Sequence, residues 1–169
     1  MASDVLKRFE PAVLELAAAL RARSWRIATA ESCTGGLIAA ACTSVAGSSD
    51  WFERGFVSYS NAAKQAMLDV PATAIDAHGA VSEAVARAMA HGALAHAHAD
   101  LAAAVTGIAG PGGAVPGKPV GTVWLALARR NAAGAVVTEA TLLQLDGDRG
   151  AIRERTVEIA LQRLLAAAR

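Results

Sequence analysis

The segment DLAAAVTG, residues 100–107, places the strongest constraint on the fold of this 169-residue chain. It is a short, nearly continuous apolar run, and it lacks the alternation of apolar and polar residues that marks a strand with one face exposed to solvent. Strands of this kind are buried on both faces of a sheet, where helices cover them. Helical periodicity occurs on either side of the run, at residues 3–22, 82–99 and 148–169. The sequence therefore predicts a three-layer α/β/α sandwich.

Further strands and helices alternate along the first half of the chain. Residues 24–30 and 54–60 are predicted strands, and each leads into a predicted helix, at 35–47 and at 61–70. Asn61 is the expected N-cap of the second helix. Residues 121–130 and 136–145 form a hairpin-like pair of strands. Strand–helix alternation followed by a hairpin indicates an α/β fold with a mixed, mostly parallel sheet.

Composition and charge exclude several classes of protein. The length suits one domain, residues 1–169. The chain is 54% hydrophobic, but no stretch approaches the roughly 20 apolar residues of a membrane span. The first 20 residues carry acidic side chains, unlike a signal peptide, so we expect a cytoplasmic protein. A net charge of +1 without a basic stripe argues against nucleic acid, and the apolar surplus favours a homodimer or higher homo-oligomer.

The cysteines and histidines suggest neither a disulfide nor a metal site. Cys33 and Cys42 are expected on opposite faces of one helix, too far apart to pair, which fits a reducing compartment. The four histidines lie in or beside an alanine-rich helix without a convincing ligand spacing: His78, His91, His96 and His98. We expect them on a solvated surface and expect no metal.

Three short polar or glycine-rich loops each follow a predicted strand. They are ESCTGG (31–36), YSNAAK (59–64) and TGIAGPGG (106–113). Ligands of open α/β sheets collect beyond the carboxyl ends of the strands. We therefore expect these loops to converge on one site.

The first loop places Ser32 before an expected helix that begins near Cys33 or Thr34. Unpaired N–H groups at such a helix start could hold the oxyanion formed when the Ser32 hydroxyl attacks a carbonyl. Gly35 and Gly36 would let a substrate approach the backbone. The alternative is that Ser32 or Thr34 only caps the helix and the glycines only ease packing. The G-x-x-x-x-G-K spacing of a phosphate loop is absent.

The second loop offers a base for Ser32, which no histidine is placed to supply. Lys64 falls in the first turn of a helix, close to apolar residues, and burial there would lower its pKa. Tyr59, the only tyrosine in the chain, could relay a proton between Ser32, Lys64 and a leaving amine. The alternative is a surface lysine and a tyrosine whose hydroxyl lies in water.

The third loop, within residues 106–121, holds six of the fifteen glycines and three of the five prolines. Together with Thr106, its backbone could bind an anion, although an ordinary crossover loop is the alternative. Lys118, Arg149 and Arg153 could bind a phosphate, or they could belong to a solvated face.

Six motifs in order carry a family resemblance: AESCTGG, GFVSYSNAAKQAML, GAVSEAVARAMAHGAL, AVTGIAGPGG, KPVGTVW and LDGDRGAIRERT. The chain closely resembles the CinA C-terminal domain family, also called the PncC nicotinamide-nucleotide amidase family, from about residue 10 to the end. The resemblance implies an α/β/α domain, often self-associating, that converts nicotinamide mononucleotide to nicotinate mononucleotide and ammonia. Some members carry an additional N-terminal pyrophosphatase-like domain, which we do not expect here.

The resemblance also implies residue roles that favour the catalytic interpretation over the alternatives above. It implies a metal-free and cofactor-free serine amidase, with Ser32 as nucleophile, Lys64 as base and Tyr59 as proton relay. The implied nucleotide-binding loop comprises Thr106, Gly107, Gly110, Pro111 and Gly112.

The remaining expected substrate-binding residues are Glu31, Cys33, Thr34, Gly35, Gly36, Asn61 and Arg149. Glu31 is expected to orient Lys64 or a ribose hydroxyl. The Cys33 thiol is an alternative attacker beside Ser32. Two rival functions are a binding or regulatory module with little turnover and a metal-dependent nucleotide-phosphate hydrolase, which would need a cluster of acidic ligands.

Overall fold

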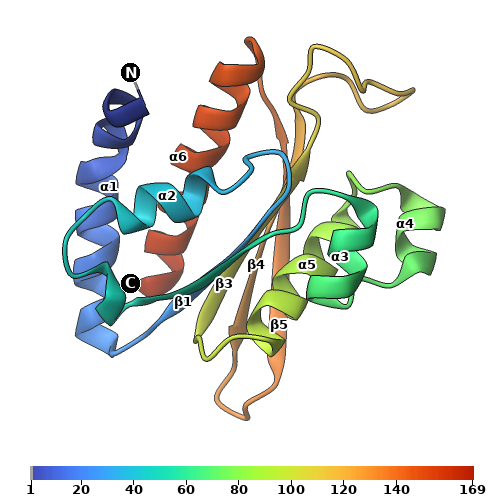
Figure 1. The fold of residues 1–169 in the computed structure, drawn as a ribbon. Coiled ribbons are helices and arrows are strands. Elements are labelled where there is room, and N and C mark those ends of the chain that lie inside the picture. Colours follow the sequence, from blue (N-terminus) through green and yellow to red (C-terminus); the bar gives the residue numbers. More distant parts are fainter. Residues whose placement is uncertain (1) are drawn as a thin grey trace.

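A five-stranded sheet lies between two layers of helices in the computed structural model, which describes residues 2–169 and the side chains from Asp4 onward (Figure 1). The strands are β1 (Ile27–Glu31), β2 (Phe52–Val57), β3 (Leu101–Gly107), β4 (Thr122–Arg130) and β5 (Val136–Gln144). The helices are α1 (Ala2–Arg23), α2 (Leu37–Thr43), α3 (Asn61–Leu68), α4 (Ala72–His78), α5 (Glu83–Ala95) and α6 (Arg149–Ala168), with a short 3-10 turn, η1 (Ser48–Asp50). The predicted three-layer α/β/α fold is confirmed.

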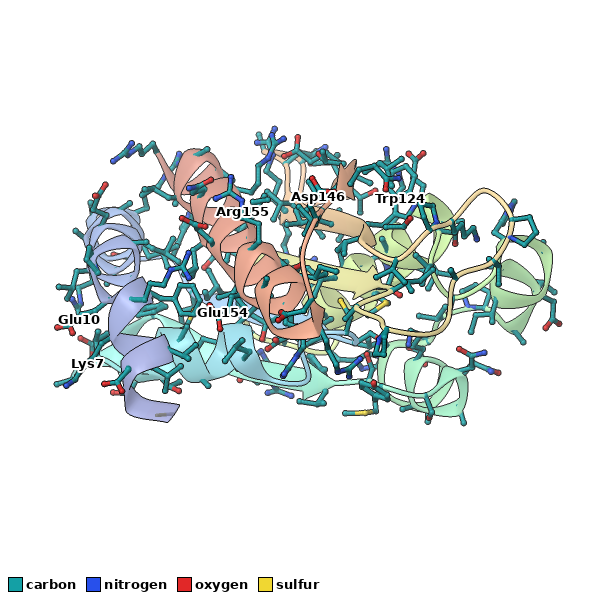
Figure 2. The ribbon with its side chains drawn as sticks, turned by 90° about the horizontal axis from the view of Figure 1, so that it is seen from above. Lys7, Glu10, Trp124, Asp146, Glu154 and Arg155 are labelled. Atoms are coloured by element: carbon teal, nitrogen blue, oxygen red, sulfur yellow. The ribbon has the colours of Figure 1, made fainter. Side chains whose placement is uncertain are left out.

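The central strand β3 explains the layering, because its apolar side chains enter two separate cores. Leu101, Ala103 and Val105 pack with α1, α2 and α6, whereas Ala102 and Ala104 pack with α5. The helices therefore cover both faces of the strand, as its apolar run predicts. Figure 2, viewed from above, shows α6 with the labelled Glu154 and Arg155 on one side of the sheet and α5 on the other.

The strand order is β2-β1-β3-β4-β5. The pairs β1–β2 and β1–β3 are parallel, whereas β3–β4 and β4–β5 are antiparallel. The mixed sheet is thus confirmed, but its parallel and antiparallel pairings are equal in number. The carboxyl ends of β1, β2, β3 and β5 lie at one edge of the sheet. The N-terminus of α6, which follows β5, therefore lies near the three predicted loops.

Three local predictions were wrong. Helix α2 begins at Leu37 rather than near Cys33 or Thr34, because Gly36 takes a left-handed conformation (φ 95°) and a turn occupies residues 33–36. Cys33 consequently precedes the helix that contains Cys42. Ser60, not Asn61, caps α3, since its hydroxyl accepts a hydrogen bond from the Ala63 N–H.

Helix α4 was not predicted either. It follows Pro71, which acts as its N-cap residue, and it ends at Gly79, whose φ is 77°. Its seven residues are too few to show a clear hydrophobic period.

No helix of residues 2–169 combines the length and apolar character needed to cross a bilayer. Both thiols, Cys33 and Cys42, are free and buried. The four histidines are all exposed. The described part of the chain contains no group of three or more His, Cys, Asp or Glu side chains suited to a metal ion.

Candidate active site

Ser32 follows β1 directly and is held at the edge of the sheet by the strand ladder. Its N–H donates to the Val105 carbonyl at 3.1 Å, which continues the pairing of β1 with β3. The residue is 8% exposed, so it is largely buried. The Lys64 Nζ lies 2.9 Å from the Ser32 Oγ.

Lys64 is only 1% exposed although it lies in the first turn of a helix. Residues 58–60 connect β2 to α3, and the start of α3 at the Ser60 cap brings the Lys64 Nζ to Ser32. Its Nζ also donates to the carbonyls of Ser58 at 3.1 Å and Tyr59 at 2.9 Å. Sequence reasoning missed these two backbone acceptors, because nothing in a sequence reports where a carbonyl points.

The acceptors around Lys64 are all neutral oxygens, and no carboxylate of residues 2–169 forms an ion pair with it. Removal from water disfavours the charged form of an amine. Burial therefore lowers the pKa of Lys64 below its ordinary value. A lysine with a lowered pKa has a larger neutral fraction that can accept a proton from a neighbouring hydroxyl.

The turn at residues 33–36 presents backbone donors beside the Ser32 hydroxyl. Its internal hydrogen bonds run from Gly35 N–H to the Ser32 carbonyl and from Leu37 N–H to the Thr34 carbonyl. Within the described part of the chain, the Thr34 N–H has no acceptor, and the Cys33 N–H donates to no other residue and contacts only its own thiol. The expected oxyanion donors thus belong to this turn, not to the first turn of a helix.

Glu31 does not contact Lys64. Its buried carboxylate accepts hydrogen bonds from the Thr34 hydroxyl at 2.7 Å and from the N–H groups of Ile38 at 2.8 Å and Ala39 at 2.9 Å. Both carboxylate oxygens are occupied inside the protein, so the expected orientation of Lys64 or a ribose by Glu31 is replaced by contacts with its own loop. The Thr34 side chain also faces inward rather than toward a substrate.

Cys33 is the first residue of the turn at 33–36, and its thiol is buried. Burial raises its pKa to about 11, with the nearby Glu31 carboxylate acting in the same direction. A thiol that keeps its proton near neutral pH is a poor nucleophile.

Tyr59 contributes its backbone and its side chain to different parts of the site. Its carbonyl accepts from Lys64 and lies 3.5 Å from the Ser32 Oγ. The residue is 58% exposed, and the phenol oxygen accepts a hydrogen bond from Arg149 at 3.3 Å. The phenol is therefore oriented toward Arg149, and the proposed proton relay through it stays a prediction.

The start of α6 connects the loops. Arg149 donates to the Gly110 carbonyl at 3.0 Å as well as to the Tyr59 phenol, and Arg153 donates to the Thr34 carbonyl at 2.9 Å. Lys118, by contrast, donates to the His78 carbonyl at the end of α4.

Residues of the third loop differ in exposure. Thr106 is buried and donates to the Ala80 carbonyl, and Gly107 packs so closely that an added Cβ would lie 2.6 Å from Val123. Pro111 and Gly112 are exposed, as is Asn61 at the start of α3. The surface that the loop offers a ligand thus comes from its later residues.

The family model of the CinA C-terminal domain matches residues 10–168. The chain belongs to this family. It is 50% identical over 159 residues to the nicotinamide-nucleotide amidohydrolase PncC of Enterobacter agglomerans, covering 94% of each chain. It is also 55% identical over 150 residues to a CinA-like protein of Mycolicibacterium vanbaalenii, covering 89% of this chain but 34% of that protein.

A solved structure supports the assignment to the CinA C-terminal domain family. The competence damage-inducible protein A of Klebsiella pneumoniae matches with a TM-score of 0.85 at 41% identity, covering 93% of this chain and 94% of that chain. The matched region of this family member includes Ser32, Lys64 and the loops around them.

Proposed function

We propose that this member of the CinA family is an amidohydrolase that converts nicotinamide mononucleotide to nicotinate mononucleotide and ammonia. The amidohydrolase name of the Enterobacter agglomerans relative supports the substrate. The observation that carries the chemistry is the 2.9 Å contact between the Ser32 hydroxyl and the buried amine of Lys64. Hydroxyl and amine at this distance can exchange a proton directly.

The first half-reaction forms an ester. Neutral Lys64 takes the proton of Ser32 as its Oγ attacks the carboxamide carbon, and the oxygen of the tetrahedral intermediate accepts hydrogen bonds from the Cys33 and Thr34 N–H groups. The Lys64 ammonium then returns the proton to the departing nitrogen. Breaking the C–N bond releases ammonia and leaves a nicotinoyl ester on Ser32.

The second half-reaction consumes water. Lys64, neutral again, removes a proton from a water molecule that attacks the ester carbonyl, and the proton passes to Ser32 as the C–O bond breaks. The product is a carboxylic acid, which ionises. This cycle needs no metal or cofactor. The Tyr59 phenol, as a proposed relay, would assist the proton transfer to the leaving amine.

We further propose that Arg149 binds the phosphate of the mononucleotide. Its exposed guanidinium already bridges the Tyr59 phenol and the Gly110 carbonyl, so it lies between the second and third loops. A guanidinium offers two parallel donors to a phosphate. Phosphate binding at Arg149 would orient the carboxamide at Ser32 through contacts remote from the reacting bond.

The direct test incubates the protein with nicotinamide mononucleotide and a chelator and measures ammonia. The wild-type chain should release ammonia and nicotinate mononucleotide in equal amounts, and Ser32→Ala should not. Binding of the mononucleotide without ammonia release would instead support a regulatory module. Metal-dependent release of phosphate would support a nucleotide-phosphate hydrolase. Self-association and a cytoplasmic location remain predictions.

A further inference from the structure

Glu31 carries the one carboxylate of the first loop, residues 31–36, and the proposed reaction gives it no chemical step. It is 1% exposed. One oxygen accepts from the Thr34 hydroxyl and the Ile38 N–H, and the other accepts from the Ala39 N–H. A buried carboxylate with this many donors is held in a single orientation.

One of these three donors lies within the turn at residues 33–36, and the other two lie just after it. Thr34 belongs to the turn itself, whereas Ile38 and Ala39 belong to the first turn of α2. Glu31 precedes the turn, so its hydrogen bonds to Ile38 and Ala39 join the end of β1 to the start of α2. The turn between them depends on Gly35 and Gly36, whose φ values are 59° and 95°.

A second contact holds the turn from outside. Arg153, on α6, donates to the Thr34 carbonyl at 2.9 Å. Gly35 lies against the same guanidinium, since an added Cβ would be 3.7 Å from its Nη2. The turn is therefore bound by an anion on one side and a cation on the other.

We infer that Glu31, supported by Arg153, is a positioning residue that fixes the Ser32 hydroxyl and aims the Cys33 and Thr34 N–H groups at the reacting carbonyl. The inference rests on the proposed function, because it assigns those N–H groups to the oxyanion. A displacement of about 1 Å in such a constellation can cost roughly 100-fold in rate. Loss of one oxyanion donor costs about 100- to 1,000-fold.

The experiment compares Glu31→Ala and Glu31→Gln with a control, Asp100→Ala. Asp100 accepts a hydrogen bond from the Arg26 N–H at 2.8 Å just before β1, at the end opposite Ser32. Both alanine variants thus remove a carboxylate from backbone N–H groups next to the same strand. Thr34→Val, which removes only the hydroxyl donor to Glu31, serves if Glu31→Ala does not fold.

Two readouts are measured below the melting temperature of every variant. The first is kcat and KM for ammonia release from nicotinamide mononucleotide. The second is the rate at which phenylmethylsulfonyl fluoride modifies Ser32, a reaction in which Lys64 takes the hydroxyl proton, an O–S bond forms and the S–F bond breaks to release fluoride. The sulfonyl oxygens need the same N–H donors, but the reaction needs no nucleotide.

We expect Glu31→Ala to lower kcat and the sulfonylation rate about 100-fold, with KM nearly unchanged. Glu31→Gln should recover part of both rates, because an amide oxygen can replace one carboxylate oxygen but its NH₂ cannot accept from Ala39. Thr34→Val should lower both rates to a smaller extent. Asp100→Ala should lose thermal stability yet keep both rates within about twofold of wild type, as expected for a change far from the site.

The inference is overturned if Glu31→Ala reacts as fast as wild type, or if Asp100→Ala slows both reactions equally. It is also overturned if the loss appears only in KM. A wild-type protein that reacts with the sulfonyl fluoride but releases no ammonia would contradict the proposed substrate alone, and the sulfonylation rates would still test Glu31. A wild type inert toward both reagents would overturn both proposals.

Discussion

The Ser32 hydroxyl and the adjacent Cys33 thiol are the two candidate nucleophiles, and the pKa of the thiol distinguishes between them. The pKa of Cys33 is raised from an ordinary 9.0 to about 11. At pH 8, this leaves on the order of one thiol in a thousand ionised, compared with about one in ten for an unperturbed thiol. Burial thus reduces the reactive thiolate population roughly 100-fold. Ser32, by contrast, has the Lys64 amine within 2.9 Å.

We therefore predict that Cys33→Ala keeps at least half of the wild-type kcat for ammonia release at pH 8. The substitution removes one buried sulfur atom and should cost about 1 kcal/mol of unfolding free energy. Ser32→Ala should lose a factor of about 10⁴ or more in kcat, since substitution of a serine nucleophile removes the covalent pathway. Both variants should be compared by coupled ammonia assay after circular dichroism shows that they are folded.

The rate of alkylation is an independent measure of how far the Cys33 thiol is ionised. Iodoacetamide should modify Cys33 at pH 8 about 100-fold more slowly than a small free thiol, because only the thiolate reacts. The reasoning is refuted if Cys33 is alkylated rapidly and alkylation abolishes activity. It is equally refuted if Ser32→Ala retains turnover while Cys33→Ala loses it.

Three further predictions follow from charges at the site. kcat/KM should rise as Lys64 loses its proton, at a pH below the ordinary lysine pKa, because burial lowers the pKa of Lys64. Lys64→Arg should be inactive at all pH values, since a guanidinium stays protonated. Arg149→Ala should raise KM for nicotinamide mononucleotide at least tenfold, yet leave the slow hydrolysis of the phosphate-free riboside almost unchanged. Between pH 9.0 and about 11 the folded state keeps the Cys33 proton that the unfolded state loses. The free energy of unfolding should therefore fall as pH rises through this window, by at most roughly 3 kcal/mol, and this part of the fall should be absent in urea titrations of Cys33→Ala.

The sequence predicted the architecture because its main signals are strong and local. The apolar run of β3 requires cover on both faces, and the long helices α1, α5 and α6 show a clear hydrophobic period. Helix starts were less predictable. Ser60 and Asn61 are both good cap residues, and the choice between them depends on where β2 leaves the sheet, which only the pairing with β1 decides.

The contact between Ser32 and Lys64 was foreseeable from topology, since both residues follow parallel strands that end at one edge of the sheet. The role of Glu31 was not. Its acceptor contacts reach N–H groups seven and eight residues later, and they depend on two glycines in left-handed conformations. The direction of the Tyr59 phenol was equally hidden, because its partner Arg149 is 90 residues away in the chain.

The placement of Glu31 and the lowered pKa of Lys64 are physically connected. A carboxylate facing the amine would favour its charged form and raise its pKa, which would remove the proposed base. Glu31 lies next to Ser32 in the sequence, so it is the acidic residue best placed to do this. The turn at Gly35 and Gly36 instead brings the start of α2 back over the carboxylate, which there binds N–H groups. Lys64 is left among neutral oxygens, and the same turn that sequesters the negative charge presents the donors that an oxyanion needs.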